Sequence, residues 1–163
     1  MLSATVRLSV MAMLAAGLVA CTPVPHVAHM RPAVEGIVLE EGKPVAGAQL
    51  FLGKFPGNSQ PCTDVGEVIP VTADGRFSWM AVDEHRRTTS LLNPPAASGT
   101  LTVLCIRHPA KGSLIGAVLF VMQNESVALR LRCDLARPRA SGGAHTVSAM
   151  LGQPHYCEAS DAG

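Results

Sequence analysis

The sequence predicts an all-β domain, an antiparallel β-sandwich of about seven strands. Short stretches alternate between apolar and polar residues, which is the period of a strand with one buried face. Glycine, proline, asparagine and aspartate separate these stretches as turn residues. No long segment has the 3.6-residue period of an amphipathic helix, so we expect strands throughout.

The first two strands flank a turn. Residues 34–40 are expected to form the first strand, and Gly42 and Pro44 mark the turn that follows. Residues 46–52 alternate as the second strand. Residues 53–64 are rich in glycine, proline, asparagine and serine and are expected to form a loop.

A hairpin follows this loop. Residues 65–73 are expected to form the third strand, either at a sheet edge or with a bulge at Pro70, because a proline cannot donate a ladder hydrogen bond. Asp74 and Gly75 are a strong hairpin signal. Residues 76–80 return as the fourth strand, with two aromatic residues on one face.

Three strands complete the domain. Residues 100–108 alternate, residues 114–122 form an apolar run suited to burial on both faces, and residues 127–133 show the clearest alternation. The stretch between the fourth and fifth strands, residues 82–99, is irregular, and we expect a long loop there, with a short helix as the alternative.

The N-terminal segment has the pattern of an export signal. Arg7 is its positive charge, and the apolar residues 8–20 are too few to span a bilayer. The segment ends in Leu18-Val19-Ala20-Cys21, which resembles the lipobox of bacterial lipoproteins. The resemblance implies that residues 1–20 are removed as a signal peptide and that Cys21 is acylated, for example with palmitate, as a membrane anchor.

The remaining chain divides into three parts. Residues 21–33 would be the acylated cysteine and a flexible tether, because three prolines interrupt the segment. Residues 34–137 would be the sandwich, and residues 138–163 a flexible tail tied by a disulfide. Thr22 stands where an aspartate favours the inner membrane in enteric bacteria, so we expect anchoring at the outer membrane, facing the periplasm.

The charge balance excludes one class of partner. Arg7 is the only charged residue before Cys21, so the mature chain carries 12 basic and 12 acidic residues. It has no basic footprint of the kind that binds nucleic acid. We therefore expect no nucleic-acid partner, and contact with a membrane through the lipid anchor.

Four cysteines follow Cys21, and an even number in an exported chain indicates two disulfides. The preferred pairing is Cys62–Cys105 and Cys133–Cys157, because Cys105 and Cys133 fall on apolar faces of strands, where each can fix a less regular segment. The alternative joins Cys105 to Cys133 and Cys62 to Cys157. Zinc binding is the competing interpretation, but no two of these cysteines have C-x-x-C spacing.

Two segments carry a family resemblance. Gly36-Ile37-Val38 leads into Gly42-Lys43-Pro44-Val45-Ala46-Gly47-Ala48, and Thr72-Ala73-Asp74-Gly75-Arg76-Phe77 follows. Together they resemble the carboxypeptidase regulatory-like domains, with their G-x-P-x-x-G-A turn and D-G-R-F hairpin. The resemblance covers residues 34–80 and implies an Ig-like or transthyretin-like sandwich that serves as an accessory module beside enzymes, transporters or adhesins.

The sequence contains no catalytic motif, so we expect no enzyme activity, no catalytic residue and no cofactor. Asp83, Glu84 and His85 lie together and could form an acid–base group, but no partner motif supports catalysis. We interpret residues 83–87 as a solvated charged loop.

His26, His29 and Met30 offer an alternative chemistry. Two imidazoles and a thioether are suitable copper ligands. Because the three residues lie in the expected tether, nothing fixes their geometry, and we assign no metal site.

The sequence therefore predicts a membrane-tethered, non-enzymatic binding or assembly module of the cell envelope. Its partner would be a protein or another envelope component. We expect the binding surface in loops 53–64 and 82–99, since loops on a rigid sandwich are free to vary. A periplasmic copper or small-ligand binder and an accessory lipoprotein of a secretion system are the alternatives.

Overall fold

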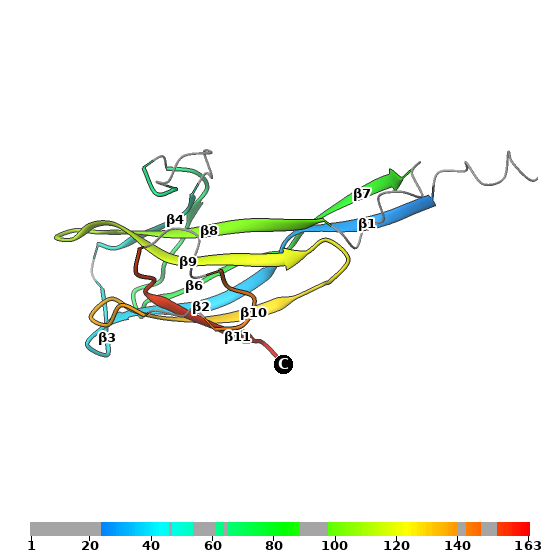
Figure 1. The fold of residues 1–163 in the computed structure, drawn as a ribbon. Helices are drawn as coiled ribbons and strands as arrows, with labels where there is room; N and C mark the ends of the chain where they lie inside the picture. The colour runs from blue at the N-terminus through cyan, green and yellow to red at the C-terminus, as the bar shows by residue number, and fades with distance from the viewer. Residues whose placement is uncertain are drawn as a thin grey trace, which may run out of the picture.

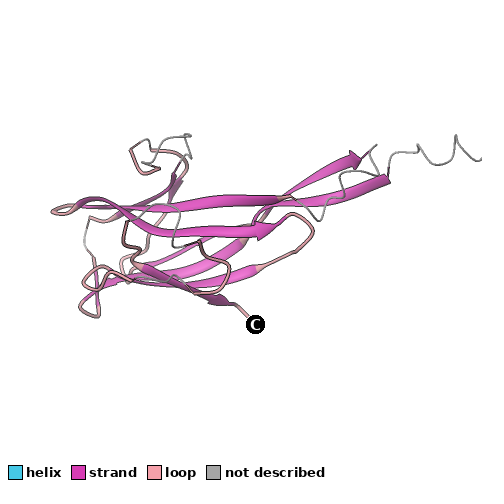
Figure 2. Ribbon diagram, in the orientation of Figure 1, coloured by secondary structure: helices cyan, strands magenta, loops and turns pink. Residues whose placement is uncertain are grey.

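The described part of the chain is built from β-strands. The computed structural model describes residues 24–45, 47–53, 61–63, 65–88, 98–139, 143–147 and 153–163. In these ranges the regular secondary structure consists of strands, with no α-helix, which confirms the all-β class (Figure 2). None of these residues belongs to a helix long and apolar enough to cross a membrane. Cys21 and the signal segment lie outside the described ranges.

Two sheets pack face to face (Figure 1). The strands are β1 (Val24–Arg31), β2 (Ala33–Glu40), β3 (Lys43–Pro44), β4 (Gln49–Gly53), β5 (Val68–Ile69), β6 (Arg76–Trp79), β7 (Val82–Thr88), β8 (Gly99–His108), β9 (Gly112–Met122), β10 (Ala128–Asp134) and β11 (Cys157–Asp161). The β2 sheet has the order β11-β10-β2-β3, with β6 also paired to β2, and the β8 sheet has the order β5-β4-β8-β9. β10 runs parallel to β2, whereas the other described strand pairs are antiparallel.

Each of the seven predicted strands has a counterpart, namely β2, β4, β5, β6, β8, β9 and β10. The third differs most, because β5 covers two of the residues predicted as strand over 65–73. Pro70 follows its last residue, and β5 lies at the edge of its sheet, which is one of the two outcomes expected from this proline. Beyond the proline, Val71 bridges to Phe77 and starts the predicted hairpin.

The main core lies between the two sheets. Leu129, Leu131 and Cys133 of β10 are buried, and the residues between them are exposed, which confirms the alternation. Phe77 and Trp79 of β6 enter the same core, with ring centroids 5.9 Å apart. Burying a large apolar side chain contributes roughly 1.5–3 kcal/mol, so this layer is the main source of stability.

A second apolar cluster covers the opposite face of the β8 sheet. Phe51 and Val103 are buried there, and Cys62 packs on the cluster from the segment that follows β4. The disulfide Cys62–Cys105 ties that segment to β8. Of the predicted loop 53–64, residues 54–60 and 64 lie outside the described ranges.

The chain's C-terminal residues belong to the sandwich, so the predicted flexible tail over 138–163 is wrong for β11. This strand pairs antiparallel with β10, and the disulfide Cys133–Cys157 joins directly opposed positions. Residues 143–147 then form hydrogen bonds with both β9 and β11. This segment covers the adjacent edges of the two sheets, which would otherwise expose unpaired backbone.

A two-stranded ribbon replaces part of the expected tether and loop. β1 pairs antiparallel with β7, so the predictions of a flexible tether over 21–33 and of a loop over 82–99 are wrong for these two strands. The ribbon continues the β2–β6 pairing in the same register as far as Arg31, opposite Val82, where a bulge shifts it. The long-range pairing overrides the local effect of the prolines and the charged residues.

Candidate functional site

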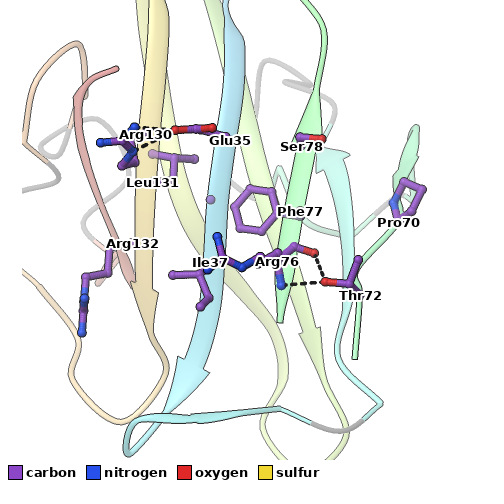
Figure 3. Close-up of a pocket in the computed structure, with 11 residues that line it drawn as sticks. Glu35, Ile37, Pro70, Thr72, Arg76, Phe77, Ser78, Arg130, Leu131 and Arg132 are labelled. Atoms are coloured by element: carbon purple, nitrogen blue, oxygen red, sulfur yellow. Dashed lines mark hydrogen bonds and ion pairs between the residues drawn. The ribbon is translucent and has the colours of Figure 1, made fainter. Parts of the chain in front are cut away.

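The structure has an open groove on the outer face of the β2 sheet, across β6, β2 and β10 (Figure 3). Its volume is about 810 Å³. We call it the basic groove, and it is lined by Glu35, Gly36, Ile37, Pro70, Thr72, Arg76, Phe77, Ser78, Arg130, Leu131 and Arg132.

Strand alternation places the charged residues on this face. Because Leu129 and Leu131 point into the core, Arg130 and Arg132 of β10 point outward. The pairing of β10, β2 and β6 then puts Arg132, Ile37 and Arg76 in one cross-strand row. Half-buried Ile37 therefore lies between two arginine positions in this row.

The neighbouring row contains an ion pair. Arg130 donates from Nε and from Nη2 to Oε1 of Glu35, at 2.8 and 2.7 Å. Both side chains are more than half exposed to solvent, at 60% and 57%. Exposed pairs of this kind contribute between about 0 and 1 kcal/mol, so a ligand can replace either partner at small cost.

The hairpin before β6 orients Arg76. Arg76 donates from Nε to Oδ2 of Asp74 at 2.9 Å, and the Thr72 hydroxyl donates to the other carboxylate oxygen. The hydroxyl of Thr72, and secondarily Arg76, keep the pKa of the Asp74 carboxyl below its usual value. Gly75 has a φ of 82°, which permits this tight turn.

Arg132 is the uncompensated charge of the groove. It is exposed, and within the described ranges its guanidinium forms no hydrogen bond or ion pair. The lining residues contain three arginines and one carboxylate, so the groove carries a positive excess. Among the described residues, neither a histidine nor a cysteine lines it. This arrangement can bind an anionic group, with an apolar contact at Ile37.

The structure separates the proposed copper ligands. His26 and His29 are three residues apart in β1, which places them on opposite faces of the ribbon. Nδ1 of His29 lies 2.8 Å from Oδ1 of Asp83. The sulfur of Met30 instead accepts a hydrogen bond from Nη2 of Arg86, at 3.6 Å. No group of three His, Cys, Asp or Glu residues in the described ranges could hold a metal ion. The three residues do not form one site.

Residues 83–87 belong to β7 and not to a loop. Successive side chains therefore point to opposite faces, and Glu84 pairs with Arg86 at 2.7 Å while Asp83 faces His29. Residues 89–97, the rest of the expected binding loop, lie outside the described ranges. The candidate acid–base group is thus divided between two faces.

The basic groove was missed by reasoning from sequence. The alternation over 127–133 shows that Arg130 and Arg132 face solvent, but nothing local shows that β10 lies parallel to β2. That pairing brings these arginines beside Glu35 and Ile37. Comparisons with protein-family models, with curated proteins and with solved structures each found no match.

Proposed function

We propose that this chain is a lipid-anchored, non-enzymatic binding module of the bacterial cell envelope, whose basic groove binds an acidic segment of another envelope protein. The main support for binding by the groove is the row Arg132–Ile37–Arg76. In this row, Arg132 has no hydrogen-bond or ion-pair partner in the described part of the chain.

The anchor rests on the N-terminal sequence. Leu18-Val19-Ala20-Cys21 ends an apolar segment and resembles a lipobox. Two disulfides support an oxidising compartment, because thiols are kept reduced in the cytoplasm. The similarity to carboxypeptidase regulatory-like domains supports an accessory role, and a sandwich with that hairpin is compatible with it.

An acidic protein segment fits the groove better than a small anion does. The three arginines lie on two strands, β6 and β10, on either side of β2 and not around one point, so a single phosphate or carboxylate would meet them one at a time. A segment lying across the strands could present several carboxylates and also cover Ile37. A carboxylate of this segment could replace Glu35 as the partner of the exposed Arg130, and Arg130 would then be a second cation that binds the segment.

The test is charge reversal in the groove. Full-length chain is captured after cross-linking in its native envelope, and bound proteins are compared for wild type, Arg132→Glu and Arg137→Glu. Arg137 is 85% exposed and outside the groove, so it is the matched control. We expect Arg132→Glu to lower partner affinity about tenfold or more, with the wild-type affinity falling as salt rises.

Equal recovery with Arg132→Glu and Arg137→Glu would exclude the groove as the binding surface. A partner whose contact segment lacks Asp and Glu would also contradict the proposal. Circular dichroism of both variants checks that the sandwich remains folded.

A further inference from the structure

The β1–β7 ribbon projects beyond one end of the sandwich (Figure 1). It forms its own two-stranded sheet and is continuous with β2 and β6, which lie in the sandwich. The eight residues of β1, at about 3.3 Å per residue, give a length of about 26 Å.

The base of the ribbon is held at several points. Nε1 of Trp79 donates to the carbonyl of Pro32 at 3.0 Å, and this bond is buried. Arg31 donates from Nη1 to Oε2 of Glu67 at 2.6 Å. The backbone N–H of His29 donates to the carbonyl of Gln123 at 2.9 Å, in the turn after β9. These bonds restrict hinge motion between ribbon and sandwich.

The two ends of the ribbon differ in charge. Pro25 lies opposite Arg87 and His26 opposite Arg86, so the described residues of the distal end, 24–26 and 86–88, include two arginines and no carboxylate. Asp83 and Glu84 lie nearer the base. Arg86 pairs with Glu84, whereas exposed Arg87 has no partner in the described part of the chain.

The lipid anchor would sit beside this basic end. Cys21 precedes Val24, the first residue of β1, by three positions. Three residues reach at most about 11 Å. An acylated Cys21 would therefore hold the distal end at the lipid headgroups.

We propose that the β1–β7 ribbon is a stiff stalk whose basic distal end rests on the anionic headgroups of the membrane that holds Cys21. The inference rests on the acylation in the proposed function and adds to it the height and orientation of the sandwich. The basic groove would stand beyond the stalk, at a constant distance from the bilayer. A freely jointed tether would allow many distances instead.

Trp79 is the only tryptophan of the chain and lies at the base of the stalk, so it reports this distance. The acylated full chain is placed in vesicles of zwitterionic lipid and phosphatidylglycerol that contain a headgroup-labelled acceptor. Time-resolved energy transfer from Trp79 should show one narrow distribution of distances. Glu84→Pro, which interrupts the ribbon, should broaden it, whereas Glu84→Ala, which removes the same side chain, should leave it narrow.

Hydrogen exchange tests the headgroup contact. In vesicles with phosphatidylglycerol, peptides of β1 and β7 should exchange more slowly than in purely zwitterionic vesicles. A contact worth about 1 kcal/mol for a basic residue near an anionic surface corresponds to a difference of about fivefold. Arg87→Glu should abolish this difference, and Arg137→Glu, the same charge change outside the ribbon, should preserve it.

The outcomes separate the stalk from the anchor. An unmodified Cys21 in protein from its native host overturns the anchor and the stalk together. An acylated Cys21 with a broad wild-type distance distribution overturns the stalk alone. Exchange in β1 and β7 that is equal in both kinds of vesicle overturns the headgroup contact.

Discussion

At the scale of single residues, His155 is a polar side chain that is buried in the sandwich. It is 1% exposed, and neither ring nitrogen has a hydrogen-bond partner within the described ranges. Burial lowers the pKa of its imidazole below 6.5, because the charged form loses its hydration. Its backbone bridges Ile115 of β9 and Arg139, so the neutral ring belongs to the packing of the C-terminal segment.

This burial predicts a pH dependence of stability. The unfolded chain takes up a proton on His155 before the folded chain does, so this contribution is fully present above pH 6.5 and is lost as the pH falls through the folded pKa. His155→Leu should flatten the fall in unfolding free energy between about pH 7 and pH 5. Denaturant titrations at each pH measure it. Exposed His85→Leu is the control, and an unchanged slope in His155→Leu would contradict the prediction.

Gly36 is a position where only glycine fits. A Cβ there would lie 2.4 Å from Cζ of Phe77 and 2.8 Å from the carbonyl oxygen of Leu131. We expect Gly36→Ala to lower the unfolding free energy by about 1–3 kcal/mol, as overpacking does. In a double-mutant cycle with Phe77→Leu, part of this loss should be recovered. Simple additivity of the two changes would show that the ring is not the obstacle.

At the scale of elements, seven of the strands in the sandwich were predictable because each carries its own apolar pattern. The clearest case is β10, where Leu129, Leu131 and Cys133 alternate with charged residues. β1 and β7 were not predictable, since prolines and charges argue against strands locally and the pairing residues lie more than 50 positions apart. The parallel β10–β2 pairing that builds the basic groove is also a property of the whole fold.

The disulfide Cys133–Cys157 fixes β11 to β10 beside the basic groove. Replacing both cysteines with alanine should lower the unfolding free energy by about 2–4 kcal/mol, chiefly because the unfolded chain gains freedom. Urea denaturation of the oxidised wild type and the double variant gives the difference. A free-energy difference below about 0.5 kcal/mol would show that β11 is held by its strand pairing instead.

At the scale of the whole molecule, the proposed parts follow one another along the chain. An anchor at Cys21 leads into the β1–β7 stalk, the stalk into the β2 sheet, and the β2 sheet carries the basic groove on its outer face. In this arrangement, the proposed binding surface lies on the β2 sheet, which continues directly from the β1–β7 stalk. Cys21→Ser should therefore release the folded chain from the membrane fraction or leave it unprocessed, without changing binding by the groove.

The most direct test of the lipid-anchored account is the mass of the N-terminal peptide of the mature protein, purified from membranes of its native host. The account predicts a chain that begins at Cys21 and carries acyl groups on it, and the same peptide from Cys21→Ser should lack them. A mature protein that retains residues 1–20, or that begins at an unmodified Cys21, would contradict the account.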